Sequence, residues 1–331
     1  MGREGSGPYR WRVGNPARTP HRWSIVVARI AAIDIRVHVS FLVLVVLFAV
    51  AAPEPGPIGV LWSLVWLLVI FGSVVVHELA HCVVARTRGA DVHEILLFPL
   101  GGISKLDRLP ETPRDEFAVA VVGPLASLGI GAAAAALCVV TGRDLLPFDL
   151  LTGAWLERIA WLNVILGGFN LLPAFPLDGG RVFRSLLERH RDLLSATRVA
   201  TRTGHVLAGV LVAIGVLFDP WLVLIGVFVY VGASAEEAAT IVHVRLQGHR
   251  VGELMRPGVG GPAGPKREAG TTLDADTPLD IDVVARLQEA QGVATVVSDG
   301  HEVGELRLDD VRRFVAGQQT PPDRGEGAKR E

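Results

Sequence analysis

The chain has 331 residues, half of them hydrophobic, and its mean hydropathy is +0.40. This composition excludes an ordinary soluble domain and indicates a membrane protein with several spans and smaller soluble parts. The 32 Lys and Arg residues nearly balance the 34 Asp and Glu residues, so the charge shows no nucleic-acid footprint. Two cysteines, Cys82 and Cys138, lie in apolar runs, which argues against a disulfide framework and a cysteine-ligated metal.

Residues 1–30 are polar and rich in arginine, and no cleavable signal peptide is recognisable in them, so we expect a cytoplasmic arm. A transmembrane domain is predicted over residues 31–240. About 20 apolar residues cross a bilayer, and by this measure we count about six transmembrane helices in a polytopic α-helical membrane protein. The predicted spans are 37–52, 58–85, 117–140, 153–175, 204–218 and 221–233.

Two stretches depart from a simple span. The last two predicted spans are short and suggest a hairpin around Asp219 and Pro220. The stretch "LFPLGGISKL" (97–106) is apolar but short and interrupted by glycines. It is typical of a hairpin or re-entrant loop rather than of a span.

Basic residues alternate between the predicted loops. The N-terminal arm and the loops after the second and fourth spans carry arginines and lysines, whereas the loops between them are nearly bare. The positive-inside rule therefore predicts a multi-pass protein of the plasma membrane with both termini in the cytoplasm.

The second span contains the stretch "VVVHELAHCVVAR" (74–86). His77 and His81 are four residues apart and share one face of a helix. Two imidazoles at this spacing can hold zinc, and Glu78 between them can act as a general base on water. Ionisable side chains are expensive within a span and are functional by default, which favours a metal site over a structural polar cluster.

A catalytic zinc needs a third protein ligand, and Asp178 is the candidate. It lies in "NLLPAFPLDGGR" (170–181), after two prolines and before two glycines, at the end of the fourth predicted span. We expect the prolines to end the helix and the glycines to let the backbone turn tightly, which places the carboxylate on irregular backbone. An ordinary turn with an aspartate cap is the alternative.

These segments resemble the site-2 protease family of intramembrane zinc metalloproteases. "HELAH" and "NLLPAFPLDGGR" match its two motifs, "FPLGGISKL" resembles its Gly-Gly loop, and "VVGPLAS" (121–127) resembles a further segment in which Ser127 replaces an asparagine. The resemblance implies one Zn²⁺ per chain held by His77, His81 and Asp178, with Glu78 as general base. It also implies that Asn170 binds the substrate backbone, whereas Asn163 is assigned to helix packing. The implied substrate is a membrane-embedded regulatory protein, cleaved in or near a transmembrane segment.

Residues 241–317 are charged and mixed in pattern, with a Gly/Pro-rich insert at 256–270, and predict a small cytoplasmic α/β module. This module resembles a single divergent CBS repeat, which implies a homodimer and the branch that includes the sporulation pro-sigma-factor protease. The ligand signature of that repeat falls on Gly304, Arg307 and Asp310, and Arg307 departs from it, so adenine nucleotide binding stays open. The tail 318–331 is predicted to be disordered.

A second class of function competes with proteolysis. The chain could be a catalytically inactive metal-binding membrane protein or a CBS-regulated transporter. The intact Glu78 and Asp178 argue against the first. The absence of paired interrupted spans from the sequence pattern argues against the second.

Overall fold

The computed structural model describes residues 23–90, 92–99, 101–106, 112–146, 150, 153–258 and 271–318. Most of the predicted N-terminal arm, of the Gly/Pro-rich insert and of the predicted disordered tail therefore lies outside the described residues. The chain divides into two compact units. One comprises Met1–Glu111 with Val122–Gly167, and the other Thr112–Val121 with Gly168–Glu331.

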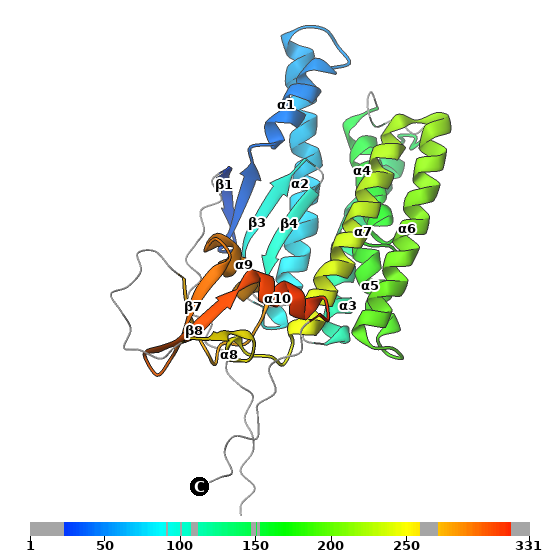
Figure 1. Cartoon of the computed structure of the whole chain (residues 1–331). Helices are drawn as coiled ribbons and strands as arrows, with labels where there is room; N and C mark the ends of the chain where they lie inside the picture. Colours follow the sequence, from blue (N-terminus) through cyan, green and yellow to red (C-terminus); the bar gives the residue numbers. More distant parts are fainter. Residues whose placement is uncertain are drawn as a thin grey trace, which may run out of the picture. The chain divides into compact units, whose positions relative to one another are not determined.

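The first unit contains a four-stranded sheet in the order β1-β2-β3-β4. Its strands are β1 (Ser24–Ile30), β2 (Ile33–His38), β3 (Val92–Phe98) and β4 (Gly101–Leu106). β2 pairs parallel with β3, and the two outer pairs are antiparallel. The long helix α2 (Pro57–Thr87) contacts β3 and β4, as Figure 1 shows. The predicted hairpin at 97–106 is confirmed, and its first strand begins earlier, at Val92.

The start of the chain forms a hairpin that the sequence analysis did not predict. Residues 24–30, assigned to the polar arm, form β1, and residues 37–38, assigned to the first span, belong to β2. Ala31 and Ala32 make the turn between these strands, both with positive φ. This is the conformation of a two-residue hairpin turn, which usually carries Asn or Gly. The alternating burial of Ile33 and Ile35 then fixes the register of β2.

The helices of the first unit are α1 (Phe41–Val50), α2, most of α3 (Pro113–Val140) and most of α4 (Trp155–Asn170). The helices α3 and α4 approach closely because small residues lie between them. A Cβ at Gly131 would lie 2.9 Å from Val164, and one at Gly167 would lie 2.7 Å from the Pro124 carbonyl oxygen. Packing through small residues is typical of helices in lipid, where the burial of apolar surface provides no driving force for helix association.

In the second unit, α5 (Asp178–Leu187) precedes two long helices, α6 (Leu193–Phe218) and α7 (Pro220–Leu246). Asp219 joins the two long helices and accepts a hydrogen bond from the Trp221 backbone N–H, while Pro220 occupies the first turn of α7. The predicted hairpin is confirmed, but both of its helices are far longer than expected. The additional turns contain polar residues and were therefore not counted as part of the spans. Their side chains form hydrogen bonds within the fold; for example, the Thr197 hydroxyl group donates to the Leu193 carbonyl oxygen.

Four described helices are long and apolar enough to cross a membrane: α2, α3, α6 and α7. The helix α1 is apolar but has ten residues, and α4 has sixteen. Each predicted span therefore coincides with at least part of a helix. The chain is a mainly helical membrane protein, and the count of six spans stays a prediction.

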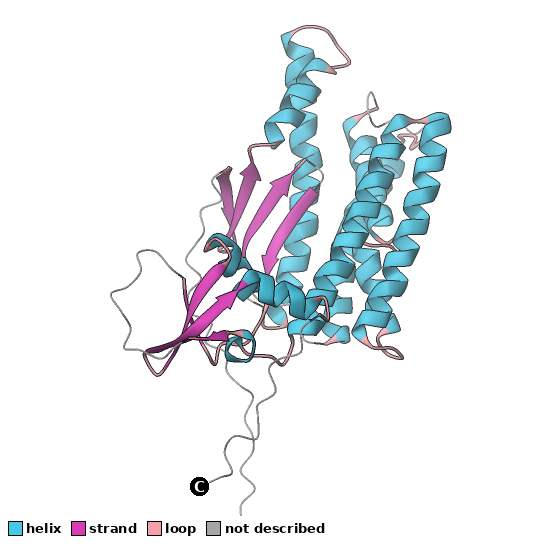
Figure 2. Cartoon of the chain, in the orientation of Figure 1, coloured by secondary structure: helices cyan, strands magenta, loops and turns pink. Residues whose placement is uncertain are grey.

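The last part of the second unit is a small α/β module, as predicted. It comprises α8 (Val251–Leu254), β5 (Arg256–Pro257), β6 (Thr272–Asp274), α9 (Ile281–Glu289), β7 (Val293–Ser298), β8 (His301–Arg307) and α10 (Leu308–Val315). Its strands run in the order β5-β8-β7-β6, and α9 and α10 contact β7 and β8 (Figure 2).

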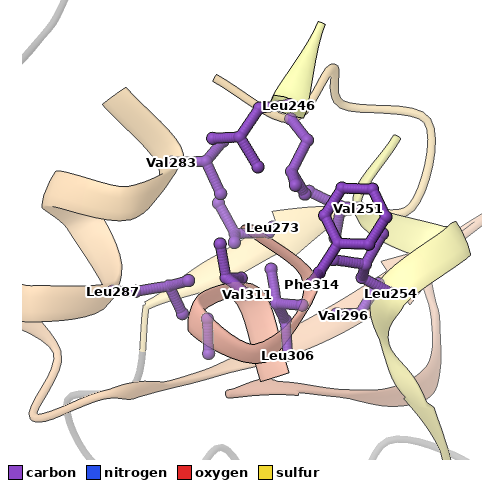
Figure 3. Packing of buried hydrophobic residues seen from close by; sticks show 12 residues of the cluster. Leu246, Val251, Leu254, Leu273, Val283, Leu287, Val296, Leu306, Val311 and Phe314 are labelled. Carbon is purple, nitrogen blue, oxygen red and sulfur yellow. The ribbon is translucent and has the colours of Figure 1, made fainter. Parts of the chain in front are cut away.

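A hydrophobic core holds the module together, and Figure 3 shows its side chains converging. Leu246, the last residue of α7, belongs to this core, so the long helix is anchored directly in the module. The core includes Leu246, Val251, Leu254, Leu273, Val283, Leu287, Val296, Leu306, Val311 and Phe314. The resemblance to a CBS repeat stays a prediction.

Candidate metal centre

The helix α2 places His77 and His81 one turn apart on a single face. Their imidazole Nε2 atoms lie 3.2 Å from each other, and the ring planes are inclined at 74°. His77 is only 4% exposed, and His81 is half-buried. Two imidazoles that direct the same nitrogen at one point can bind a single metal ion between them.

The helix α3 approaches both imidazoles through two small residues that are four positions apart. Ser127 is fully buried, and its Oγ lies 3.0 Å from His77 Nδ1. One turn earlier, a Cβ at Gly123 would lie 2.8 Å from His77 Nε2 and closer still to His81 Nε2. The glycine therefore leaves free the volume in front of the two nitrogens that a side chain would fill.

The β-hairpin approaches Glu78, the predicted general base. A Cβ at Gly102, in strand β4, would lie 2.7 Å from Glu78 Cγ. The Glu78 side chain is half-buried. Gly102, the second glycine of the predicted loop, thus allows the backbone of β4 to pass directly beside this carboxylate.

Asp178 is the first residue of α5, so the expectation of irregular backbone at this position was wrong. Leu177 before it is extended, and the carboxylate occupies the first helical turn, where the helix dipole favours a negative charge. Gly179 and Gly180 are helical and serve close packing rather than a turn. A Cβ at Gly180 would lie 2.6 Å from the Phe175 backbone nitrogen.

His77, His81 and Asp178 each offer one ligand atom, and these atoms lie within 4.8 Å of one another. The three residues assigned to zinc by the sequence are therefore together. Two imidazoles and one carboxylate form a donor set known from catalytic zinc sites, which keep a further position for water or substrate. With the space beside Gly123, the donor set fits a zinc ion.

The two asparagines of α4 differ in their surroundings. Asn163 is completely buried, and its Nδ2 donates to Ser73 Oγ at 3.1 Å and to the Ile159 carbonyl oxygen at 3.0 Å. This contact joins α4 to α2, which agrees with the predicted packing role. Asn170 ends α4 and is half-buried, and its role in substrate binding stays a prediction.

In the C-terminal module, the two candidate nucleotide residues have structural partners. Asp310 is 2% exposed and accepts hydrogen bonds from Arg256 at 2.7 and 2.8 Å and from Arg313 at 3.2 Å. These guanidinium groups lower the pKa of the Asp310 carboxyl, Arg256 most of all. A Cβ at Gly304 would clash with the Arg256 carbonyl oxygen, so the close pairing of β5 with β8 accounts for this glycine.

A second group of charged residues surrounds Arg184 in α5. Its guanidinium forms ion pairs with Glu116 and with Glu236, the latter at 3.2 Å, and Glu188 lies 3.8 Å away. Burial raises the pKa of the Glu188 carboxyl, and repulsion from Glu116 adds to this effect, while Arg184 opposes it. The arrangement ties the helix that begins with Asp178 to α7.

The chain matches the model of peptidase family M50 over residues 65–146 and 149–214. It is 34% identical over 239 residues to a zinc metalloprotease of Methanocaldococcus jannaschii, across 71% of this chain and 67% of that protein. It is 36% identical over 252 residues to the Rip3 protein of Mycobacterium tuberculosis, across 71% of this chain and 64% of that protein.

A solved structure of the site-2 protease from Methanocaldococcus jannaschii is also similar, with 32% identity and a TM-score of 0.49. The match covers 65% of this chain and 95% of that one. The chain thus spans about two thirds of the length of the sequence relatives it matches.

Proposed function

Since the chain belongs to peptidase family M50 and is a zinc-dependent membrane protease, we propose that it cleaves a membrane-tethered regulatory protein in or near a transmembrane segment. The observation that carries this proposal is the group of two imidazoles and one carboxylate, with two of its members on α2, a helix apolar enough to cross a membrane. Ionisable groups within a span are costly and mark a functional site, and in a protease such a position brings the catalytic group to a scissile bond in or beside the bilayer.

In this proposal, His77, His81 and Asp178 hold one Zn²⁺ per chain. Zinc supplies Lewis-acid chemistry, which polarises the scissile carbonyl and makes water nucleophilic at neutral pH. Glu78 follows His77 in the helix and is rotated about 100° from it, so its carboxylate can take the proton of the attacking water without serving as a ligand. The same carboxyl group then returns that proton to the leaving amine.

In this proposal the protease binds the main chain of the substrate. Asn170 at the end of α4 donates from its amide to the substrate backbone or to the developing oxyanion. A transmembrane helix protects its own peptide bonds, so the substrate has to unwind locally. Strand β4 lies at the edge of its sheet among the described strands, and an extended substrate segment can pair beside it next to Glu78.

A comparison of Glu78→Gln with the unchanged protein tests this function against a metal-binding protein without activity. The amide has the shape of the carboxyl group but cannot accept the water's proton, so cleavage of a co-expressed membrane-tethered reporter should fall about 100-fold or more. Zinc content should stay unchanged. Normal cleavage by Glu78→Gln would contradict the mechanism. If cleavage falls as expected, mass spectrometry of the proteins that remain bound to Glu78→Gln would identify the natural substrate.

The arginine and lysine distribution supports the proposal that both termini of this plasma-membrane protein lie in the cytoplasm. A reporter enzyme that is active only outside the cytoplasm, fused after residue 240, should therefore be silent. Activity there would overturn the proposed orientation. The resemblance of the C-terminal module to a CBS repeat favours homodimerisation. The contacts of Gly304 and Asp310 within the module argue against adenine nucleotide binding.

A further inference from the structure

We infer that Ser127 is a positioning residue of the metal centre: its hydroxyl group fixes the tautomer and the ring orientation of His77. The inference rests on the proposed role of His77 as a zinc ligand. Its basis is the contact between Ser127 Oγ and His77 Nδ1, which lie 3.0 Å apart across two helices and 50 residues of sequence.

The placement of the ring nitrogens defines the tautomer. His77 directs Nε2 at Nε2 of His81, so this nitrogen has to carry a lone pair if both imidazoles bind one metal ion. The proton of the neutral His77 ring then lies on Nδ1. An N–H at Nδ1 needs an acceptor in a buried site, and Ser127 Oγ lies within hydrogen-bond distance of it.

Because both side chains are buried, the contact between Ser127 and His77 strongly restricts the orientation of the His77 ring. Ser127 is 0% exposed and His77 is 4% exposed, so water does not compete for Nδ1 as it would at a surface. Without the hydroxyl group, the ring can turn and populate the tautomer with its proton on Nε2. That tautomer cannot ligate a metal through Nε2.

The same face of α3 brings Ser127 to its place. Gly123, one turn earlier, allows the helix to approach both imidazole nitrogens, and the approach sets the distance at which a short side chain reaches Nδ1. A serine at position 127 therefore acts together with a glycine at position 123. Groups that hold a ligating histidine in this way typically change metal affinity by about 10- to 100-fold when removed.

Ser127→Thr and Ser127→Val form the decisive pair, because threonine and valine have nearly the same shape and differ in the hydroxyl group. Zinc affinity is measured by competition with a chelator in detergent-solubilised full-length protein, and the visible spectrum of the Co²⁺-loaded protein reports the ligand geometry. We expect zinc to bind Ser127→Val and Ser127→Ala about 10-fold or more weakly than Ser127→Thr. The Co²⁺ spectrum should change in Ser127→Val and Ser127→Ala but not in Ser127→Thr.

Ser63→Ala is the matched control. Ser63 is also a nearly buried serine and lies on α2, but fourteen residues before His77. This variant should bind zinc as the unchanged protein does. Equal zinc affinity of Ser127→Val and Ser127→Thr would overturn the inference, since these two side chains have nearly the same shape and differ in the hydroxyl group. Failure of the unchanged protein to bind zinc would instead contradict the proposed function, so the two failures are distinguishable.

Discussion

Polar side chains are buried in two regions of the molecule, with opposite consequences. In the C-terminal module, Asp310 is paired with Arg256 and Arg313, so its charge is neutralised within the fold. Between α2 and α3, His77 contacts the hydroxyl group of Ser127 and faces the imidazole of His81. The first arrangement fastens strand β5 to helix α10, whereas the second directs two nitrogen lone pairs at one point.

This difference separates structural from functional burial. A buried carboxylate that accepts several charge-assisted hydrogen bonds is stabilised by its partners, and its burial requires no ligand. A buried and a half-buried imidazole that direct the same atom at each other gain little from that contact alone. Their arrangement becomes favourable when an ion occupies the point at which they are directed.

The largest effect is expected at Gly123, where the two helices meet in front of the imidazoles. In Gly123→Ala, the new methyl group would lie 2.8 Å from His77 Nε2 and would fill the place of the ion. Zinc affinity should fall roughly 100-fold, and proteolysis should fall with it. Metal analysis and a cleavage assay check this result.

Gly129→Ala is the control for that change. Gly129 is also a glycine of α3, but a Cβ there would meet nothing within 4 Å. This variant should bind zinc normally and gain slightly in helix stability. If Gly123→Ala also kept full zinc, the open volume beside the histidines would not be the metal site.

A smaller effect is expected at Asp310, which tests the structural side of the comparison. Asp310→Asn keeps the size of the side chain but loses the charge that Arg256 and Arg313 hold, so the module should lose about 2 kcal/mol of stability. Because the Asp310 pKa is lowered in the fold, this contribution is present above its ordinary value and is lost as the pH falls through the folded pKa. Hydrogen exchange of the module amides in the full-length protein measures the change.

Asp276→Asn is the matched control in the same module. Asp276 pairs with Arg250 at 2.6 Å, but the aspartate side chain is 80% exposed, so the variant should change stability hardly at all. Zinc binding should be unaffected in both variants. Loss of zinc in Asp310→Asn alone would show that the two regions are not independent.

The smallest effect is expected at Glu188, a largely buried carboxylate that is neither fully paired, as Asp310 is, nor part of the metal centre. Its side chain is 11% exposed, and Oε1 has no hydrogen-bond partner among the described residues, although Arg184 lies 3.8 Å away. A raised pKa means that the folded state favours the protonated form, so stability is full below the ordinary value of 4.5 and declines as the pH rises through the folded pKa.

Glu188→Gln should therefore raise the melting temperature at neutral pH, on the order of 1 °C, and the gain should vanish below pH 4.5. Thermal melting over a pH series checks both the sign and the window. Glu237→Gln, at a carboxylate 3.7 Å from the half-exposed Arg198, should give no such gain. A loss of stability at neutral pH in Glu188→Gln would show that its pairing with Arg184 outweighs burial.

The sequence predicted that His77, His81 and Asp178 lie together, and local geometry accounts for part of this prediction. The spacing of His77 and His81 places both on one face of any helix, and the family motif identified Asp178. The helical position of Asp178 was missed because the prolines and glycines around it suggest a turn. The hairpin of β1 and β2 was missed because Ala31 and Ala32 carry none of the usual turn signals.

Contacts between distant parts of the sequence account for the rest. Ser127 and Gly123 were recognised as part of a family segment, but their contacts with the histidines depend on how α3 packs on α2. Two small residues four positions apart in an apolar helix are common in membrane proteins and indicate close packing of some kind. Only the arrangement of the helices shows that the packing partner is a pair of imidazoles.

The zinc content of Asp178→Ala tests the central claim most directly. Metal analysis of the purified full-length protein should find one zinc per chain before the change and far less than one after it, because two imidazoles alone hold zinc weakly. Full zinc occupancy in Asp178→Ala would contradict the assignment of this carboxylate as the third ligand and, with it, the metal centre described above.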